Sequence, residues 1–494
     1  MNPSVKAMIT KRTRNALVGL LVISVLLIIT IQKTGIDKMN KNTDNSKAII
    51  AVLSGKLSLP LDPRNIVMIS NYHLHSNLWG TLLASNPAEA LASLKSVSED
   101  GLKYRLVLKP EIKFSDGSPI LMTDVVSSIN RLLATLDNGH FNPKTAIESV
   151  KAIDDRELEF SLHQETPSFQ FLLSIPEMGI VPEKSVVNDE LRTLQITSGA
   201  YSLVEHEGER LELKKNPHYL GHQPRSPNRV SLRFMSDSAQ LAEDAKAVGA
   251  HFIEASNTSE VQSMRRMSGD SQYTILSTRP SLSFYALLND RALSEKQRVA
   301  ISDLVSRNLG YELDPATEKR SFELSPPKTF ASLGLTSSLT ALKSKPEDLP
   351  SKVTMAKTNS ALNESIASTL SNAGVEIIWL DSSAAKEADI RVRSQGMNSD
   401  FPEIEYHLLL LSQWAAFTPQ AGEEELIMKA LHEPDNSKRA EYIQRVSRAM
   451  VEDARVVPLL VRSYMHAIDH GVLEVPKFSD YDGDVRFSRM NTKE

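Results

Sequence analysis

The chain has 494 residues, 41% of them hydrophobic, so it is long enough to bury more than one core, and two or three globular units are expected. Lys and Arg number 56 against 61 Asp and Glu, a net charge of -5, which offers no basic surface for a phosphate backbone and argues against nucleic-acid binding. Cysteine is absent, which excludes disulfides, thiolate metal sites, a cysteine nucleophile and a lipid anchor on cysteine.

The N-terminal segment predicts an export signal. Four basic residues precede an apolar run at 16–31: Lys6, Lys11, Arg12 and Arg14. A signal peptide usually has about 7 to 15 apolar residues and a spanning helix roughly 17 to 25, and this run lies on the boundary. No small-x-small cleavage site follows, so an uncleaved transmembrane signal-anchor over 15–32 is favoured over a cleaved signal. The basic cluster puts 1–14 in the cytoplasm, and 33–46 read as a polar tether.

A short apolar strand at 48–53 is followed by a His-x-His pair, His73 and His75. On a strand the two side chains would face one side and could chelate a metal. No third ligand can be assigned, so packing on the surface or in a helix is favoured. No metal or cofactor is therefore predicted.

Residues 106–133 are the most ordered stretch of the sequence and predict a strand, a turn and a helix. Apolar and polar residues alternate at its start with the period of a strand. Asp116 and Gly117 form the turn, because glycine takes a positive φ at little cost. Thr123 is expected to cap the helix, and Asp124 to stabilise its first turn, where exposed amides favour a negative charge.

Helices and strands continue to alternate along the rest of the chain. A hairpin is predicted at 150–162, and helices are predicted at 298–307, 366–373, 423–431 and 439–452. Gly374 is the expected C-cap of the second helix and precedes a buried strand at 375–380. A strand at 456–461 follows the last helix. The final segment, 478–494, is polar and charged and is expected to pack loosely.

Several motifs, in this order and spacing, resemble a known family. Residues 114–132 contain a phenylalanine, Asp-Gly, a proline, Thr-Asp-Val and Arg-Leu in succession. Residues 197–201 (TSGAY) and 216–219 (NPHY) stand where that family has Gly-Thr-Gly-Pro-Tyr and Asn-Pro-x-Tyr. The family is the family 5 extracellular solute-binding proteins, which are the oligopeptide, dipeptide and nickel receptors of bacterial ABC importers.

The resemblance implies an α/β fold of two lobes, the type II periplasmic-binding-protein fold, preceded here by one transmembrane helix. The first lobe is expected over 47–275, with an extra subdomain inserted at about 71–197. The second lobe is expected over 276–454, and 455–494 return to the first lobe. A ligand would bind between the lobes, which close by a hinge motion.

Asp400 is the candidate ligand-binding residue that the resemblance implies. Residues 396–402 (GMNSDFP) resemble the family's Gly-Trp-x-x-Asp-Tyr-x-x-Pro segment, whose aspartate pairs with the α-amino group of a bound peptide. Met397 stands in place of the tryptophan, and the proline comes earlier, so an exposed turn aspartate is the competing interpretation. Arg391 and Arg393 could meet a ligand carboxylate, although a solvated strand edge is favoured for both.

The expected function is a membrane-tethered, monomeric solute-binding protein that captures short peptides and delivers them to an ABC permease. Its globular part would lie in the periplasm or outside the cell, anchored to the inner membrane by a single pass. A receptor for another solute, such as a nickel chelate or a sugar, and an anchored sensor or scaffold without a transport role are the alternatives. An enzyme is disfavoured, and no catalytic residue is predicted, since the sequence contains no G-x-S-x-G, H-E-x-x-H or phosphate-loop motif.

Overall fold

The computed structural model describes most of the chain from residue 48 onward. The described residues are 48–66, 69–135, 146–235, 240–255, 258–278, 280–315, 317–326, 329, 331–341, 343–358, 360–381, 384–396, 401–411, 419–475 and 485–493. The predicted signal-anchor, the tether and Asp400 lie outside them. No helix in these ranges has both the length and the apolar character that a membrane crossing requires.

A seven-stranded sheet forms the centre of the first lobe, in the order β12-β19-β11-β1-β10-β9-β8. Its strands are β1 (Ile49–Ser54), β8 (Tyr201–Glu207), β9 (Arg210–Lys215), β10 (Arg229–Met235), β11 (Phe252–Ala255), β12 (Tyr273–Ser277) and β19 (Met465–Asp469). β1 runs parallel to β10 and β11, and the other neighbouring pairs are antiparallel. Alternate residues of β1 enter two different cores, Ala51 and Leu53 one and Val52 the other, which explains its unbroken apolar run.

Helices cover both faces of this sheet. Helix α2 (Ile69–Leu78) contributes Leu74 and Leu78 to the core that contains Ala51. Helices α5 (Leu241–Ala247) and α6 (Thr258–Arg266) pack in the core on the other face. The first lobe is therefore a three-layer α/β unit.

A four-stranded antiparallel sheet is inserted between β1 and β8, in the order β2-β3-β5-β4. Its strands are β2 (Ala92–Val97), β3 (Lys103–Leu108), β4 (Ile147–Ala152) and β5 (Glu157–Leu162). The pairing of β4 with β5 confirms the predicted hairpin. A short hairpin, β6 (Val186–Val187) and β7 (Glu190–Leu191), follows before the chain returns to the seven-stranded sheet.

The stretch 106–133 forms the predicted strand, turn and helix. Gly117 has a φ of 84°, and the Asp116 carboxylate accepts the Ser118 N–H at 2.9 Å. Lys184 pairs with the same carboxylate at 3.2 Å. Asp116 is thus a turn residue in the part of the chain that the structure describes, as its sequence context indicated.

Helix α3 (Met122–Ala134) begins two residues earlier than expected, so the prediction that Thr123 is its N-cap is wrong. The cap position belongs to Leu121, whose N–H donates to the Asp124 carboxylate at 2.8 Å. The other Asp124 oxygen accepts the Glu183 N–H, also at 2.8 Å. One buried aspartate therefore fixes both the helix start and a distant loop.

The packing around Gly199 explains why the TSGAY motif has a glycine at this position. A Cβ at this position would lie 2.5 Å from the Leu78 carbonyl carbon and 2.6 Å from the Trp79 nitrogen, so a larger residue does not fit against the end of α2. The Gly199 N–H donates to the Leu78 carbonyl at 2.9 Å, and the Asn216 side chain donates to the Gly199 carbonyl at 2.8 Å. The two motifs thus meet at one backbone contact.

A six-stranded sheet forms the second lobe, in the order β14-β18-β13-β17-β15-β16. Its strands are β13 (Leu282–Leu288), β14 (Glu318–Arg320), β15 (Lys352–Ala356), β16 (Glu376–Leu380), β17 (Ile390–Gly396) and β18 (Val456–Arg462). Helices α7 (Glu295–Asn308) and α8 (Ala361–Asn372) confirm two predicted helices, and Gly374 follows α8 with a φ of 89°. The strand predicted as buried at 375–380 is instead the edge strand β16, whose side chains are partly exposed.

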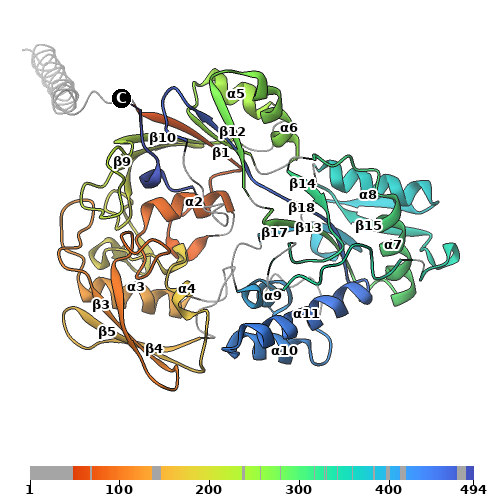
Figure 1. The fold of residues 1–494 in the computed structure, drawn as a ribbon, viewed down its shortest axis with the longest axis horizontal. Helices are drawn as coiled ribbons and strands as arrows, with labels where there is room; N and C mark the ends of the chain where they lie inside the picture. The colour runs from red at the N-terminus through yellow and green to blue at the C-terminus, as the bar shows by residue number, and fades with distance from the viewer. Residues whose placement is uncertain are drawn as a thin grey trace, which may run out of the picture. The chain divides into compact units, whose positions relative to one another are not determined.

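Three more helices belong to the second lobe: α9 (Pro402–Leu411), α10 (Glu423–His432) and α11 (Asn436–Glu452). The last two confirm the predicted amphipathic helices. In Figure 1, α9, α10 and α11 lie across from the four-stranded sheet and the short helix α4 (Phe169–Leu172). Phe171 and Phe401 meet between these two sides with ring centroids 5.7 Å apart, and His432 Nδ1 lies 2.8 Å from the Glu165 carbonyl.

The C-terminal segment packs tightly where 485–493 are described, contrary to the loose packing expected of 478–494. Val485, Phe487 and Met490 are buried in the core of the seven-stranded sheet. Arg489 pairs with the buried Glu89 carboxylate at 2.7 Å. The sequence suggested a solvated tail because these three apolar residues are separated by polar ones. In the structure, polar residues of this segment also bond to the first lobe.

Candidate functional site

The chain passes between the two large sheets twice, and both passages lie side by side. β12 of the seven-stranded sheet leads directly into β13 of the six-stranded sheet, and β18 leads back into β19. The Thr278 N–H donates to the Tyr464 carbonyl at 3.0 Å, and the Tyr464 N–H donates to the Thr278 hydroxyl at 3.0 Å. Farther along, the Ser281 N–H donates to the Arg462 carbonyl at 3.0 Å. Residues 278–281 and 462–464 thus form a two-stranded connection between the lobes, and Figure 1 shows β13, β17 and β18 close to it.

On the first-lobe side of this connection, a buried glutamate contacts two histidines. Glu254 lies on β11, His466 lies opposite it on β19, and His73 projects from α2. His73 Nε2 is 3.1 Å and His466 Nε2 is 3.7 Å from Glu254 Oε2. Burial by itself would raise the pKa of Glu254, but the His73 and His466 rings outweigh it and lower the pKa to about 2. Glu254 is therefore an anion at neutral pH.

The contacts of His73 fix the position of its proton. Its Nδ1 accepts the Val485 N–H at 3.1 Å, so the hydrogen of a neutral ring lies on Nε2, the atom that is 3.1 Å from Glu254 Oε2. His75, two residues on, is buried separately, and burial lowers its pKa to about 4. The pair lies on a helix rather than a strand, so the two rings do not face one side. The described residues contain no group of three side chains suited to hold a metal.

Tyr464 lies between the two lobes with only 1% of its surface exposed. Within the described ranges its hydroxyl has no hydrogen-bond partner. Burial raises its pKa, and the charges of Glu254 and Glu405 raise it further, so both carboxylates are close enough to interact with it.

On the second-lobe side, a chain of hydrogen bonds ends at Glu405. The Tyr285 hydroxyl donates to Gln395 Oε1 at 3.0 Å. Gln395 Nε2 donates to the Glu405 carbonyl at 2.8 Å and to Glu405 Oε2 at 3.0 Å. Burial raises the pKa of Glu405 to about 7, more than the Gln395 hydrogen bond lowers it. This carboxyl therefore titrates near neutral pH.

The arginines singled out in the sequence lie on the same strand as Gln395. Arg391 and Arg393 belong to β17, which pairs with β13 on one side and β15 on the other, so it is not a strand edge. Arg391 is buried, and burial lowers its pKa, whereas Arg393 is exposed. Arg393 lies opposite Tyr285 in the strand register and near its hydroxyl. Asp400 is outside the described residues, so its relation to this group remains a prediction from sequence.

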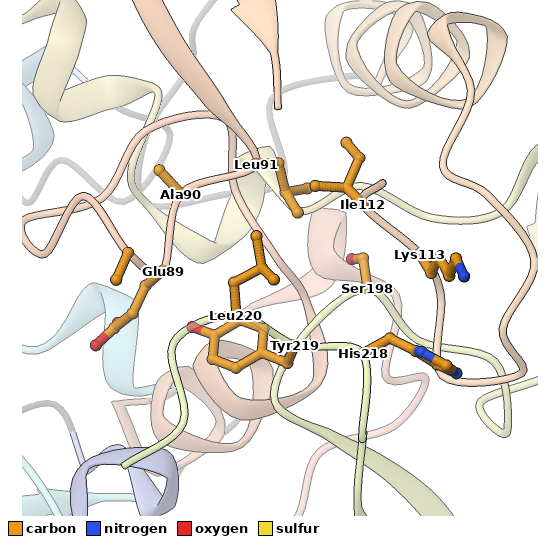
Figure 2. Close-up of a pocket in the computed structure, with 10 residues that line it drawn as sticks. Glu89, Ala90, Leu91, Ile112, Lys113, Ser198, His218, Tyr219 and Leu220 are labelled. Carbon is orange, nitrogen blue, oxygen red and sulfur yellow. The ribbon is translucent and has the colours of Figure 1, made fainter. Parts of the chain in front are cut away.

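A separate hollow opens in the first lobe, away from the connection between the lobes. Figure 2 shows it between the segments 88–91, 112–113 and 218–220, with a volume of about 240 Å³ that includes space open to solvent. Glu89 lies at one end, and Lys113 and His218 lie at the other. Glu89 is already paired with Arg489, and none of the connection residues lines this hollow.

Sequence reasoning did not identify Glu254, Tyr464, Tyr285 or Glu405. A single acidic residue at the end of an apolar strand, as in the FIEA run of β11, was the one available signal for Glu254. The others lie on unrelated segments that only the fold brings together.

Comparison with known proteins identifies relatives of this chain. Residues 86–302 match the family model of bacterial extracellular solute-binding proteins, family 5. The periplasmic oligopeptide-binding protein OppA of Salmonella typhimurium is 29% identical over 186 residues, which are 32% of this chain and 34% of that protein. The alignment thus spans about a third of the length of this relative.

Solved structures show the same fold over most of the chain. The dipeptide-binding protein of Pseudoalteromonas sp. SM9913, in complex with Met-Leu, has a TM-score of 0.78 at 13% identity and covers 90% of this chain and 100% of its own. NikA of Brucella suis, in complex with Fe(III)-EDTA, has a TM-score of 0.75 at 16% identity, with the same coverage. The two-lobed periplasmic-binding-protein fold is confirmed.

Proposed function

The chain belongs to the family 5 bacterial extracellular solute-binding proteins, and on this premise we propose that it captures short peptides between its two lobes and delivers them to an ABC importer. The observation that carries the proposal is the pair of hydrogen-bonded passages at 278–281 and 462–464, where buried polar groups of both lobes converge. Binding sites commonly occupy such domain junctions.

Capture works as a shift between an open and a closed arrangement of the lobes. A hinge of two short segments lets the lobes rotate, and a ligand that contacts both lobes stabilises the closed arrangement. Two further contacts join the lobes, the Phe171–Phe401 ring contact and the His432–Glu165 hydrogen bond. Their residues are far in sequence from the two hinge segments. They would favour closure without touching the ligand.

Asp400 is proposed as the partner of the peptide's α-amino group, and Arg391 and Arg393 as weaker candidates for a ligand carboxylate. In the sequence, Asp400 lies between β17, which contains Gln395, and α9, which contains Glu405. In a site that excludes water, an ammonium–carboxylate pair is stronger than at the surface.

The direct test is binding of di- to pentapeptides to the full-length protein by isothermal titration calorimetry and thermal shift. Saturating peptide is expected to raise the melting temperature. Asp400→Ala should weaken peptide binding by about tenfold or more, equivalent to roughly 1.4 kcal/mol. Asp381→Ala, at the exposed position directly after β16, is the matched control and should bind normally. Absence of binding for every peptide tested would refute the peptide proposal, and full affinity in Asp400→Ala would refute the anchor.

A different solute is the second candidate, supported by Met397 in place of the family's tryptophan and by the fold shared with NikA. Nickel chelates and sugars belong in the same thermal-shift screen. Stabilisation by one of them and by no peptide would favour this candidate. If the protein is an anchored sensor, it should bind a solute, but a strain that lacks the protein should take up that solute as well as wild type.

Membrane tethering through 15–32 is also proposed from the sequence. Cell fractionation should place the full-length protein in the membrane fraction, with its globular part accessible to protease outside the cytoplasm. A variant lacking 1–32 behind a cleavable signal should be released in soluble form. Recovery of the unaltered protein in the soluble fraction would contradict the anchor.

A further inference from the structure

Helix α9 carries a glutamate, Glu405, on the side that faces the first lobe. Phe401 directly precedes α9, and its ring contacts Phe171 of the first lobe with centroids 5.7 Å apart. Glu405 follows about one helical turn later, so its side chain projects on the same side of α9 as Phe401. Its charge also acts on the hydroxyl of Tyr464, in the connection between the lobes. Closure of the lobes therefore changes the surroundings of Glu405.

A side-chain amide of fixed orientation holds this carboxyl. The Tyr285 hydroxyl donates to Gln395 Oε1 at 3.0 Å, so the amide nitrogen of Gln395 is turned towards Glu405. That nitrogen donates to the Glu405 carbonyl at 2.8 Å and to Glu405 Oε2 at 3.0 Å. An amide is a neutral donor, and it stabilises a carboxylate less than the charged group of an arginine or a lysine does.

In the described part of the chain, no cation contributes to the pKa of Glu405. Burial raises that pKa to about 7, and the hydrogen bond from the amide lowers it by less. Two arginines on neighbouring elements act on other groups. Arg393 of β17 is exposed and acts on Tyr285, and Arg439 of α11 meets Glu403 at 3.4 Å. An ionised Glu405 would thus be enclosed without a positive partner from these elements.

Other titratable groups on and around α9 face different surroundings. Glu403 and His407 are each two residues from Glu405, a rotation of about 200° around the helix, so they point to other sides. Glu403 is fully buried within the second lobe, where closure does not reach it. Neighbouring elements carry Glu423 of α10, paired with Arg455, Glu254 of β11, and His432, whose Nδ1 lies 2.8 Å from the Glu165 carbonyl. His432 also spans the lobes and is tested separately below.

We propose that Glu405 links lobe closure to protonation: closing the lobes encloses its carboxyl as a neutral acid, so that capture of the solute takes up one proton. The proposal rests on the proposed function, since it assumes that a solute is captured by closure of the lobes. The proton comes from the solvent and adds to the Glu405 carboxylate. A carboxylate without a cationic partner loses its hydration when it is enclosed, and protonation removes that cost.

This linkage fixes the direction of the pH dependence. In the open arrangement the hydrated carboxyl returns towards the ordinary glutamate pKa of 4.5, whereas burial raises the pKa to about 7 in the arrangement described. Between these values the closed arrangement binds more protons than the open one. Its advantage is complete below pH 4.5 and is lost as pH rises through about 7. The solute is therefore held more tightly in an acidic medium than in a neutral one.

The test is calorimetry of Ala-Ala-Ala binding to the full-length protein at pH 5.5, 6.0 and 7.0. This peptide has no titratable side chain, and its amino group stays largely protonated over the range. The affinity is expected to fall about tenfold from pH 5.5 to 7.0. Titrations at pH 6.0 in phosphate and in imidazole, whose ionisation enthalpies differ, should show uptake of about one proton per complex. Proton release, or an affinity independent of pH, would overturn the proposal.

Glu405→Gln keeps an acceptor for Gln395 and remains neutral at every pH. It should bind Ala-Ala-Ala with the same affinity at pH 5.5 and 7.0 and take up no proton. Glu424→Gln, at an exposed position of α10, is the matched control and should behave as wild type. A pH dependence that persists in Glu405→Gln and disappears in His432→Gln would assign the proton to His432 and refute the role of Glu405.

Gln395→Leu provides the result if Glu405→Gln does not fold. It removes the amide that stabilises the carboxylate, so the fall in affinity should move to a higher pH. An unchanged pH profile in this variant would contradict the proposal.

Small-angle scattering without solute separates the proton linkage from the peptide function. The wild-type radius of gyration should be smaller at pH 5.5 than at pH 7.0, and that of Glu405→Gln the same at both. If no peptide binds at any pH, the proposed function fails, and this difference alone decides the linkage. A wild-type radius that does not change with pH would then refute the linkage as well.

Discussion

The Nδ1 atom of His73 accepts the backbone N–H of Val485 at 3.1 Å, a hydrogen bond between residues 412 positions apart in the sequence. It joins α2 to the segment 485–493, which also inserts Phe487 into the core of the seven-stranded sheet. The histidine that looked like a metal ligand in the sequence is thus a structural link between an early helix and the last described segment of the first lobe.

Phe487→Ala should lower the free energy of unfolding by about 3 to 5 kcal/mol, the usual loss for a buried phenylalanine. Its ring is 1% exposed and packs edge-on against Tyr201 with centroids 6.1 Å apart. Urea denaturation measures the change. Lys493→Ala, at an exposed position of the same segment, should stay within about 0.5 kcal/mol of wild type. Equal, small effects of both would mean that the segment packs loosely after all.

Asp124→Ala should destabilise the first lobe by roughly 1 to 3 kcal/mol, because two backbone N–H groups, of Leu121 and Glu183, lose their acceptor. Asp116→Ala is the comparison within the same stretch. Its carboxylate is a third exposed and pairs with a largely exposed lysine, so a smaller loss is expected. Thermal unfolding of both variants checks the order, and a larger loss in Asp116→Ala would contradict it.

We predict that the buried Glu177 makes the folded protein less stable as pH rises. Burial raises its pKa to about 7, above the 4.5 of an unperturbed glutamate. The folded protein then binds more protons than the unfolded chain between these values, so its contribution is complete below pH 4.5 and is lost as pH rises through about 7. The free energy of unfolding of Glu177→Gln, relative to that of wild type, should therefore be higher at pH 8 than at pH 5. The expected change is on the order of 1 to 3 kcal/mol.

Urea unfolding at pH 5 and pH 8 measures this difference. Glu148→Gln, at an exposed position of β4, is the control and should show the same pH dependence as wild type. A Glu177→Gln curve parallel to wild type across this range would show that Glu177 does not titrate in it.

Phe171→Ala should weaken solute binding several-fold although Phe171 is not in the connection between the lobes. The ring meets Phe401 across the two lobes, so its removal lowers the population of the closed arrangement and raises the apparent Kd in proportion. Calorimetry measures the affinity and small-angle scattering the fraction closed. Phe171→Leu, which keeps an apolar contact, should show a smaller effect. An unchanged affinity in both variants would show that the Phe171–Phe401 contact does not contribute to closure of the lobes.

Local signals in the sequence were sufficient for several elements. The Asp116-Gly117 turn, the glycine after α8 and helices α10 and α11 all depend on residues close in sequence, and the structure confirms each. The exact start of α3 was not predictable, because Asp124 serves the N–H of Leu121 from the third helical position while Thr123 seemed the better cap. Its second partner, Glu183, belongs to a loop that only tertiary structure brings near.

The candidate site was less predictable for the same physical reason. Glu254, Tyr464 and Glu405 come from β11, the hinge connection and α9, and none has a neighbour in sequence that marks it as special. Their meaning depends on burial and on which groups surround them. Asp400 could be proposed from a motif because a resemblance, rather than a physical pattern, pointed to it.

The place of β19 has a consequence for biosynthesis. This strand lies between β11 and β12, so the first lobe needs a strand made more than 180 residues after its neighbours to complete its sheet. The six-stranded sheet needs β18, which is also late. Neither lobe can close its core while the chain is still emerging from the ribosome, so a nascent chain shorter than about residue 465 exposes unpaired strand edges. A polypeptide that is exported unfolded benefits from such a delay, since the last tenth of the chain to be synthesised, rather than its first half, decides when it can fold.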